Sequence, residues 1–325
     1  MSDPASNIYL GTFLGPLQQW LARDDLTDLY INRPGEVWIE CQGSAPLRIE
    51  APALTRDLLQ RLARQIAAAS AQGISREHPL LAATLPGGER VQIVLPPATR
   101  GEIAIAVRKH SIAGLSLEDY AETGAFAGAD LVPADQGLQC RPPLDLAQGP
   151  VAVLRQAVRE RRNVLVSGGT ATGKTTFLNT LLREIPASER LILIEDTPEL
   201  QLAHANAIGL IAARGALGEA EVNVDDLITA SLRLRPDRII LGEVRGNEAL
   251  GFLRAVNTGH PGSMSSIHAD SPLRAIDQLA LLVMQAGTRM NWDDVVSYVR
   301  RSLDLIVQLE YRDGRRRIAQ IQTVS

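Results

Sequence analysis

Polar and apolar residues alternate with a period of two along several short segments of the first 107 residues. That period is typical of half-buried strands, and two of the segments flank the turn sequence Arg33-Pro34-Gly35, which predicts a hairpin. The expected strands cover residues 28–32, 36–40, 91–95 and 103–107. Apolar residues at helical spacing predict a helix over residues 55–72 and a short one over residues 17–23. This mixture predicts a small α+β unit.

The second half of the chain changes to buried strands that alternate with amphipathic helices. Apolar runs predict strands at residues 163–166, 191–194 and 238–243. Helices are expected at residues 151–161 and on a segment with Leu227, Ile228 and Leu232 on one side, and further helices start at Ser271-Pro272 and at Asn291. Residues 305–309 and 316–323 form a closing hairpin around Asp313-Gly314. Ligands of such α/β sheets gather at the carboxyl edge, so this half predicts a nucleotide-binding domain.

The chain has 325 residues, too many for one ordinary core, and therefore suggests two domains. We expect an α+β N-terminal domain over residues 1–112 and an α/β domain over residues 150–325. Between them, at residues 113–149, periodicity fades while Gly, Ala, Asp and Pro accumulate. This composition is typical of a linker, with some helix around residues 116–122.

One nine-residue segment of the second half fits the phosphate-binding loop G-x-x-x-x-G-K-[ST]. It lies between a predicted strand and a predicted helix, and it consists of Gly168, Gly169, Thr170, Ala171, Thr172, Gly173, Lys174, Thr175 and Thr176. Its glycines let backbone N–H groups turn toward phosphates, Lys174 reaches the β and γ oxygens, and Thr175 offers its hydroxyl to Mg²⁺. Lys174 is one of only two lysines, with Lys109, among 33 basic residues. We therefore expect a nucleoside triphosphate. Ala171 would be strained if its position needs a positive φ.

Triphosphate hydrolysis also needs a held Mg²⁺ and an oriented water, and four acids compete for these tasks. They are Glu195, Asp196, Glu199 and Glu243. Our hypothesis gives Glu243 the role of the acid that ends a Walker B strand, although Gly242 stands where such strands usually carry Asp. Glu195 or Asp196 then orients the water or the hydration shell of the metal, and either Glu243 or Asp196 contacts the metal through water. Each acid could instead cap the helix that follows its strand.

Two histidines stand in the small, polar, Gly-rich segment 258–270. A loop of this composition can bring a histidine close to a terminal phosphate and report the loss of that phosphate after hydrolysis. His268 is the candidate for this role, with His260 eight residues before it.

Charge and cysteine content narrow the possible functions. The net charge of −4 gives no global basic field, so direct nucleic-acid binding is unlikely or local, and Arg315-Arg316-Arg317 is more typical of a solvated edge. Cys41 and Cys140 are far apart and predict unpaired thiols. No segment predicts a signal peptide or a membrane-spanning helix, so any membrane contact would be peripheral.

The order of four segments resembles the Walker A, Asp, Walker B and His boxes of the type II/IV secretion ATPase superfamily. The segments are GGTATGKTT, LILIEDTPEL, SLRLRPDRIILGEVRG and TGHPGSMSSIHAD. The N-terminal segments INRPGEVWIE and ERVQIVLPPATRGEIAIAVRKHS resemble the VirB-eleven traffic ATPases of type IV secretion and conjugation. The resemblance implies a RecA-like P-loop domain with ATP and Mg²⁺ as cofactors. It also implies a homohexameric ring, peripheral at the cytoplasmic face of the inner membrane, that contacts other apparatus components including inner-membrane subunits.

In that superfamily the nucleotide sits between the two domains. By position, the resemblance assigns Arg90 and Arg108 of the N-terminal domain to γ-phosphate contact. It also points to Arg235 as a charge near the phosphates or the subunit boundary.

Three other functions remain open at this stage. The chain could be an oligomeric scaffold that binds ATP without turnover, although a scaffold needs no water-positioning acid. A nucleic-acid motor is disfavoured by the charge balance. Within the superfamily, an ATPase of type IV pilus or type II secretion assembly or retraction is the nearest alternative.

Overall fold

The structure, a computed structural model, describes residues 4–109, 121–122, 143–213 and 220–324. Most of the predicted linker, and nearly all of the helix expected at residues 116–122, lie outside the described residues. Within the described part, no helix is both long and apolar enough to cross a membrane.

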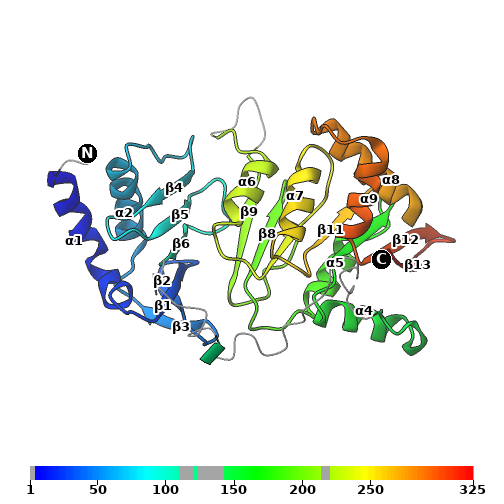
Figure 1. Cartoon of the computed structure of the whole chain (residues 1–325), viewed down its shortest axis with the longest axis horizontal. Coiled ribbons are helices and arrows are strands. Elements are labelled where there is room, and N and C mark those ends of the chain that lie inside the picture. The colour runs from blue at the N-terminus through cyan, green and yellow to red at the C-terminus, as the bar shows by residue number, and fades with distance from the viewer. Residues whose placement is uncertain (1–3, 110–120, 123–142, 214–219, 325) are drawn as a thin grey trace.

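The N-terminal domain is a six-stranded antiparallel sheet covered on one face by two helices (Figure 1). In spatial order its strands are β3 (Leu47–Ala51), β2 (Gly35–Cys41), β1 (Leu26–Ile31), β6 (Ala104–Arg108), β5 (Arg90–Val94) and β4 (Leu80–Thr84). The helices are α1 (Pro4–Leu21) and α2 (Arg56–Ala69). The predicted hairpin β1–β2, the strands β5 and β6 and the helix α2 are confirmed. The helix expected at residues 17–23 is the end of the longer α1, and β3 and β4 were not predicted.

Alternation along the strands gives this sheet two apolar faces. Leu29, Ile31 and Val107 point toward α1 and α2, whereas Tyr30 and Ala106 belong to a core that continues into the second domain. Because successive side chains point to opposite faces, one sheet can serve both its own helices and the neighbouring domain.

The C-terminal domain is a seven-stranded sheet with helices on both faces, as predicted (Figure 1). In spatial order its strands are β13 (Arg315–Thr323), β12 (Leu305–Arg312), β7 (Val164–Gly168), β11 (Met264–Ile267), β10 (Arg238–Leu241), β8 (Leu191–Glu195) and β9 (Ala207–Ile211). All neighbours are parallel except the hairpin β12–β13. One face carries α4 (Pro150–Arg159) and α5 (Lys174–Leu182). The other carries α6 (Val224–Ser231), α7 (Glu248–Asn257), α8 (Pro272–Gln285) and α9 (Trp292–Ser302).

Three details of this domain differ from the sequence-based expectation. The segment 258–270 is not all loop, because its residues 264–267 form the buried central strand β11, and β9 was not predicted. Leu232 ends α6 on the exposed side instead of joining Leu227 and Ile228 in the core. The helix caps expected at Ser271 and Asn291 are confirmed.

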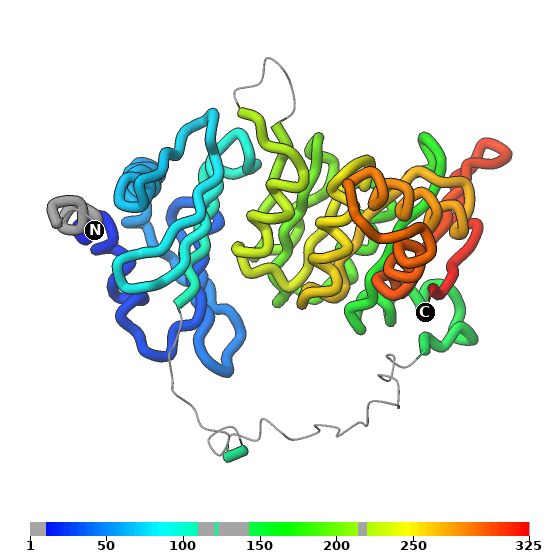
Figure 2. Tube along the Cα trace, turned by 45° about the horizontal axis from the view of Figure 1, so that its top comes forward, coloured from blue at the N-terminus to red at the C-terminus, as the bar shows by residue number. Residues whose placement is uncertain are grey.

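The two domains pack directly against each other, with β5 and β6 next to β9 and α6 (Figure 2). A buried polar cluster lies at this boundary. Arg190, 1 % exposed, lies over the Tyr30 ring at 4.1 Å from its centroid and donates to Asn32 Oδ1 at 2.8 Å. Burial lowers the pKa of Arg190 to about 10. Asn32 Nδ2 also donates to Asn206 Oδ1 at 3.0 Å. These contacts join the N-terminal domain to its own C-terminal domain at a point away from the phosphate loop.

Candidate active site

The phosphate loop connects β7 to α5 and has the backbone shape that the motif predicts. Ala171 has φ 61° and Gly173 has φ 91°, so the position of Ala171 does need a positive φ, which is strained for alanine. Thr172 Oγ1 donates to Gly169 O at 2.9 Å and closes the turn. A Cβ on Gly168 would lie 2.5 Å from Thr172 Oγ1 and 2.9 Å from Leu309 O, so only glycine fits there. The loop is thus a preformed cradle whose helix N-terminus favours an anion.

Lys174 holds its ammonium inside this cradle. The residue is 8 % exposed, and Nζ donates to Gly168 O at 3.0 Å and to Gly169 O at 3.1 Å. Burial lowers the pKa of Lys174, an effect that the nearby Glu243 carboxylate opposes. Nζ also lies 3.4 Å from both ring nitrogens of His268. The sequence-predicted lysine and histidine therefore meet at the end of β7 and β11.

Glu243 continues this row of side chains. Its Oε1 lies 2.8 Å from His268 Nε2, and its Oε2 accepts a bond from Arg245 Nη2 at 2.6 Å. Lys174, His268 and Glu243 thus form a continuous line from the phosphate loop to the end of β10.

A cavity of about 70 Å³ opens beside this line. Its lining includes Thr175 and all four predicted acids, Glu195, Asp196, Glu199 and Glu243. A cavity of this size has room for a few ordered waters. The residues thus fit a hydrated Mg²⁺, which binds through one or two protein oxygens and substrate phosphates while keeping several waters. Among the described residues, no group of three or more His, Cys, Asp or Glu forms a closed metal cage.

Glu195 differs from the other three acids because it is held by two backbone N–H groups and by an arginine of the N-terminal domain. Its Oε1 accepts bonds from the backbone N–H of Glu199 at 2.9 Å and of Leu200 at 2.7 Å. Its Oε2 forms an ion pair with Arg100 of the N-terminal domain. A Cβ on Gly242 would lie only 3.0 Å from Glu195 Cγ. The glycine where an Asp was expected therefore makes room for this glutamate.

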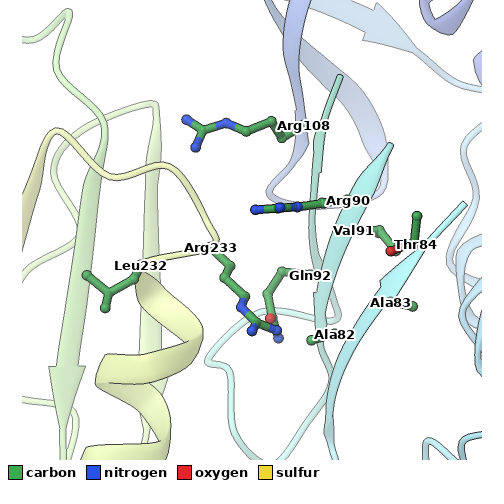
Figure 3. Close-up of a pocket in the computed structure, with 9 residues that line it drawn as sticks. All are labelled: Ala82, Ala83, Thr84, Arg90, Val91, Gln92, Arg108, Leu232 and Arg233. Carbon is green, nitrogen blue, oxygen red and sulfur yellow. The ribbon is translucent and has the colours of Figure 1, made fainter. Parts of the chain in front are cut away.

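The structure does not bring Arg90, Arg108 and Arg235 to the phosphate loop of the same chain. Arg90 and Arg108 line a separate cavity of about 310 Å³ together with Arg233 (Figure 3). Arg235 instead donates to Glu40 Oε1 at 2.9 Å across the domain boundary.

Sheet topology explains the separation of Arg233 and Arg235 from the phosphate loop. Arg233 and Arg235 precede β10, whereas Lys174 follows β7, and both strands run parallel to β11. The two groups therefore lie at opposite edges of the sheet, separated by roughly 15 Å of strand.

His260, expected to share the phosphate-sensing segment with His268, also lies away from the site. It precedes β11, while His268 follows it, so the strand separates the two histidines. His260 Nδ1 is 3.2 Å from Ala255 O, and burial lowers the pKa of the ring. In the described structure His260 therefore contacts the last turn of α7 and not the phosphate loop.

Sequence reasoning missed three arginines that contact the site. Arg245 pairs with Glu243 and stands only two residues after it, so its position near a strand-end acid was a usable signal. Arg316 Nε donates to Ala171 O at 3.0 Å, although the arginine run 315–317 was expected to be a solvated edge. Arg100 lies 95 positions from its partner Glu195, and no local pattern marks that contact.

Comparison with known proteins agrees with this geometry. Residues 146–313 match the family model described as Type II/IV secretion system protein. The VirB11 protein of Bartonella henselae is 38 % identical over 99 % of this chain and 94 % of its own length. PtlH of Bordetella pertussis, a type IV secretion system protein, is 39 % identical over 95 % of this chain and 93 % of its own length.

Among solved structures, the VirB11 ATPase of Brucella suis, crystallised with sulphate, superposes with a TM-score of 0.86 at 34 % identity. The match covers 97 % of both chains, so it includes both domains and the boundary between them. Together with the phosphate loop and its row of acids, these matches show that the chain belongs to the type II/IV secretion system protein family, as a VirB11-type ATPase.

Proposed function

We propose that this chain hydrolyses ATP with Mg²⁺ as a homohexameric ring that drives assembly of, or substrate transfer through, a type IV secretion apparatus. The observation that carries the proposal is the line Lys174–His268–Glu243 beside a cavity lined with acids. Binding alone would need the loop, but not three further acids around a water-sized space.

Each side chain has a task that its position supports. Lys174 binds the β and γ oxygens, and the Thr175 hydroxyl together with Glu243 or Asp196, through water, holds the metal. When bound, Mg²⁺ neutralises charge that develops on the phosphate oxygens. In this proposal Glu243, whose Oε1 lies 2.8 Å from His268 Nε2, also orients the attacking water and accepts its proton. His268, between Glu243 and Lys174, responds to loss of the terminal phosphate.

We propose that Arg90 and Arg108 act on the nucleotide of a neighbouring copy. Both project from the N-terminal sheet toward the C-terminal domain, in a cavity that contains no residue of the phosphate loop (Figure 3). Arg108 is paired with Asp28 at 3.0 Å, whereas Arg90 and Arg233 make no ion pair with any described residue. An arginine cluster with so little neutralising charge is suited to phosphates that arrive from outside the chain.

The ring, its peripheral place at the cytoplasmic face of the inner membrane and its contacts with inner-membrane subunits form part of the same proposal. They rest on the kinship with VirB11 proteins and PtlH, which are themselves type IV secretion system proteins.

Phosphate release, measured at several protein concentrations, tests the catalytic part. Glu243→Gln should keep ATP binding and abolish turnover, whereas Lys174→Ala should lose ATP binding. Normal turnover by Glu243→Gln would refute the proposed catalytic role of Glu243.

Mixing two inactive variants tests the contribution of the neighbour. If arginines act across a subunit boundary, rings that mix Lys174→Ala with Arg90→Ala chains contain some sites with both groups intact, and activity returns. If both groups come from one chain, every site in the mixture carries one defect, and the mixture stays inactive.

A further inference from the structure

The N-terminal domain touches the catalytic edge of the C-terminal domain at one short loop, residues 95–103, between β5 and β6. Ile211 N donates to Ala98 O at 3.0 Å, and Arg100 N donates to Gly209 O at 2.8 Å. Thr99 forms an antiparallel bridge with Leu210. The loop thus adds to the free edge of β9, and this backbone pairing fixes where the Arg100 side chain begins.

The Arg100 side chain then runs across β9 into the C-terminal domain. A Cβ on Gly209 would lie 2.5 Å from Arg100 Cδ, so the path depends on the glycine. At its end, Nη1 donates to Leu200 O at 2.7 Å and Nη2 pairs with Glu195 Oε2. Both side chains are largely buried, at 15 % exposure for Arg100 and 3 % for Glu195, so water screens this pair little.

Glu195 connects Arg100 to the active site. With its other oxygen it holds the backbone N–H groups of Glu199 and Leu200. The turn held in this way carries Asp196 and Glu199, which line the catalytic cavity with Glu243. The chain of contacts therefore runs without a break from the N-terminal domain to the acids.

We infer that Arg100 is a positioning residue, through which the N-terminal domain sets the geometry of the catalytic acids by way of Glu195. The inference rests on the proposed hydrolysis and deepens it. Without Arg100, the Glu195 carboxylate is buried beside no compensating charge, which is costly, so it must take up a proton or move. Either change loosens the turn at residues 196–200. Rotation of the N-terminal domain has the same consequence, and by reciprocity the state of the acids biases the orientation of that domain.

Two variants, called the link variants, break the series of contacts from Arg100 to the catalytic acids at different points. Arg100→Gln removes the charge, and Gly209→Ala displaces the arginine side chain without changing any charged group. We expect both to lower kcat by about 10- to 100-fold, since small displacements of catalytic groups have effects of this size. The Kd for ADP should stay unchanged, because the phosphate loop is untouched. Arg100→Lys keeps a positive charge and should restore part of kcat.

The matched control is Asn32→Ala, which removes two polar contacts of the same domain boundary, with Arg190 and Asn206, neither of which reaches Glu195. It should leave kcat unchanged even if it lowers the Tm. Hydrogen exchange of the amides of residues 197–201 gives a readout independent of turnover. Their exchange should become faster in Arg100→Gln and Gly209→Ala but not in Asn32→Ala.

Several results would overturn the inference. They are normal kcat and exchange in both link variants, a loss of ADP binding that parallels the loss of kcat, or an equal loss of kcat in Asn32→Ala. Failure of the proposed function has a different signature, namely a wild-type ring that releases no phosphate. In that case the exchange of residues 197–201 in the link variants still decides whether Arg100 holds the turn.

Discussion

Two Glu–Arg pairs of similar geometry but different burial allow a direct test of the energetics of this fold. Glu189 accepts bonds from Arg238 Nε at 2.6 Å and Nη2 at 2.9 Å, and the Arg238 side chain is 0 % exposed. Glu184 accepts bonds from Arg155 at 2.9 Å and 3.0 Å, but these side chains are 35 % and 46 % exposed. Each pair is to be broken by the same change, Glu to Gln.

Glu189→Gln leaves the Arg238 guanidinium inside the protein without its main negative partner. Breaking a buried pair in this way costs about 3–5 kcal/mol, because the remaining charge is neither solvated nor compensated. At about 2–4 °C per kcal/mol, the expected fall in Tm is about 6–20 °C. Glu184→Gln should leave the Tm nearly unchanged, because water solvates Arg155 once its partner is neutral.

The pH dependence of thermal stability provides a second, independent check on the contribution of the Glu189–Arg238 pair. Burial raises the pKa of Glu189, but the bonds and charges of Arg238 and, to a smaller extent, Arg161 outweigh it, so the net pKa lies below the ordinary value of 4.5. A depressed carboxyl pKa contributes stability above the unfolded pKa, and that stability is lost as pH falls through the folded pKa. The gap in Tm between wild type and Glu189→Gln should therefore shrink below pH 4.5.

Thermal unfolding of wild type and both variants, followed by circular dichroism at pH 7 and at acidic pH, measures all of these quantities. Equal falls in Tm for Glu189→Gln and Glu184→Gln at pH 7 would refute the reasoning. Burial would then not decide how much an ion pair contributes to the stability of this protein.

Three further changes probe other parts of the molecule. Burial lowers the pKa of His260, so this ring binds its proton at a higher pH in the unfolded chain than in the folded one, and stability falls as pH drops through about 6.5. His260→Gln should therefore reduce the difference in Tm between pH 5.5 and pH 7.5. An unchanged difference would contradict this prediction. Asn223→Ala removes the side-chain bond of the capping box of α6, from the Asp226 backbone N–H to Asn223 Oδ1, and should cost about 1 kcal/mol in urea unfolding, whereas a change near zero would show that this cap is dispensable. Gly173→Ala places a Cβ on a residue with φ 91°, at 3.2 Å from Arg316 Cδ. The strained loop should bind ADP more weakly, as measured by calorimetry. Wild-type affinity would show that the loop tolerates this strain.

Local order along the chain was sufficient to predict much of the fold. The hairpin β1–β2, the helix α2 and the strand–loop–helix that holds Lys174 all follow from spacing within a few residues, because backbone geometry and side-chain direction repeat over that range. The question whether Ala171 needs a positive φ was raised by the motif, and the backbone, with φ 61°, answered it. The strands that the sequence did not reveal include β4 and β9, whose segments LLAAT and AIGLI show no alternation of polar and apolar residues.

The candidate site likewise contains some features that local sequence predicted and others that only the tertiary structure decided. Sequence alone identified Lys174, His268 and Glu243 as candidates, but only the tertiary structure joined them into one row. It also assigned Glu195 to its contact with Arg100 and separated Arg90 from the phosphate loop of its own chain. Such outcomes depend on how two sheets dock and on which strand edge a residue reaches. Contacts between residues a hundred positions apart follow from the packing of whole domains, and no periodicity within one segment encodes that packing.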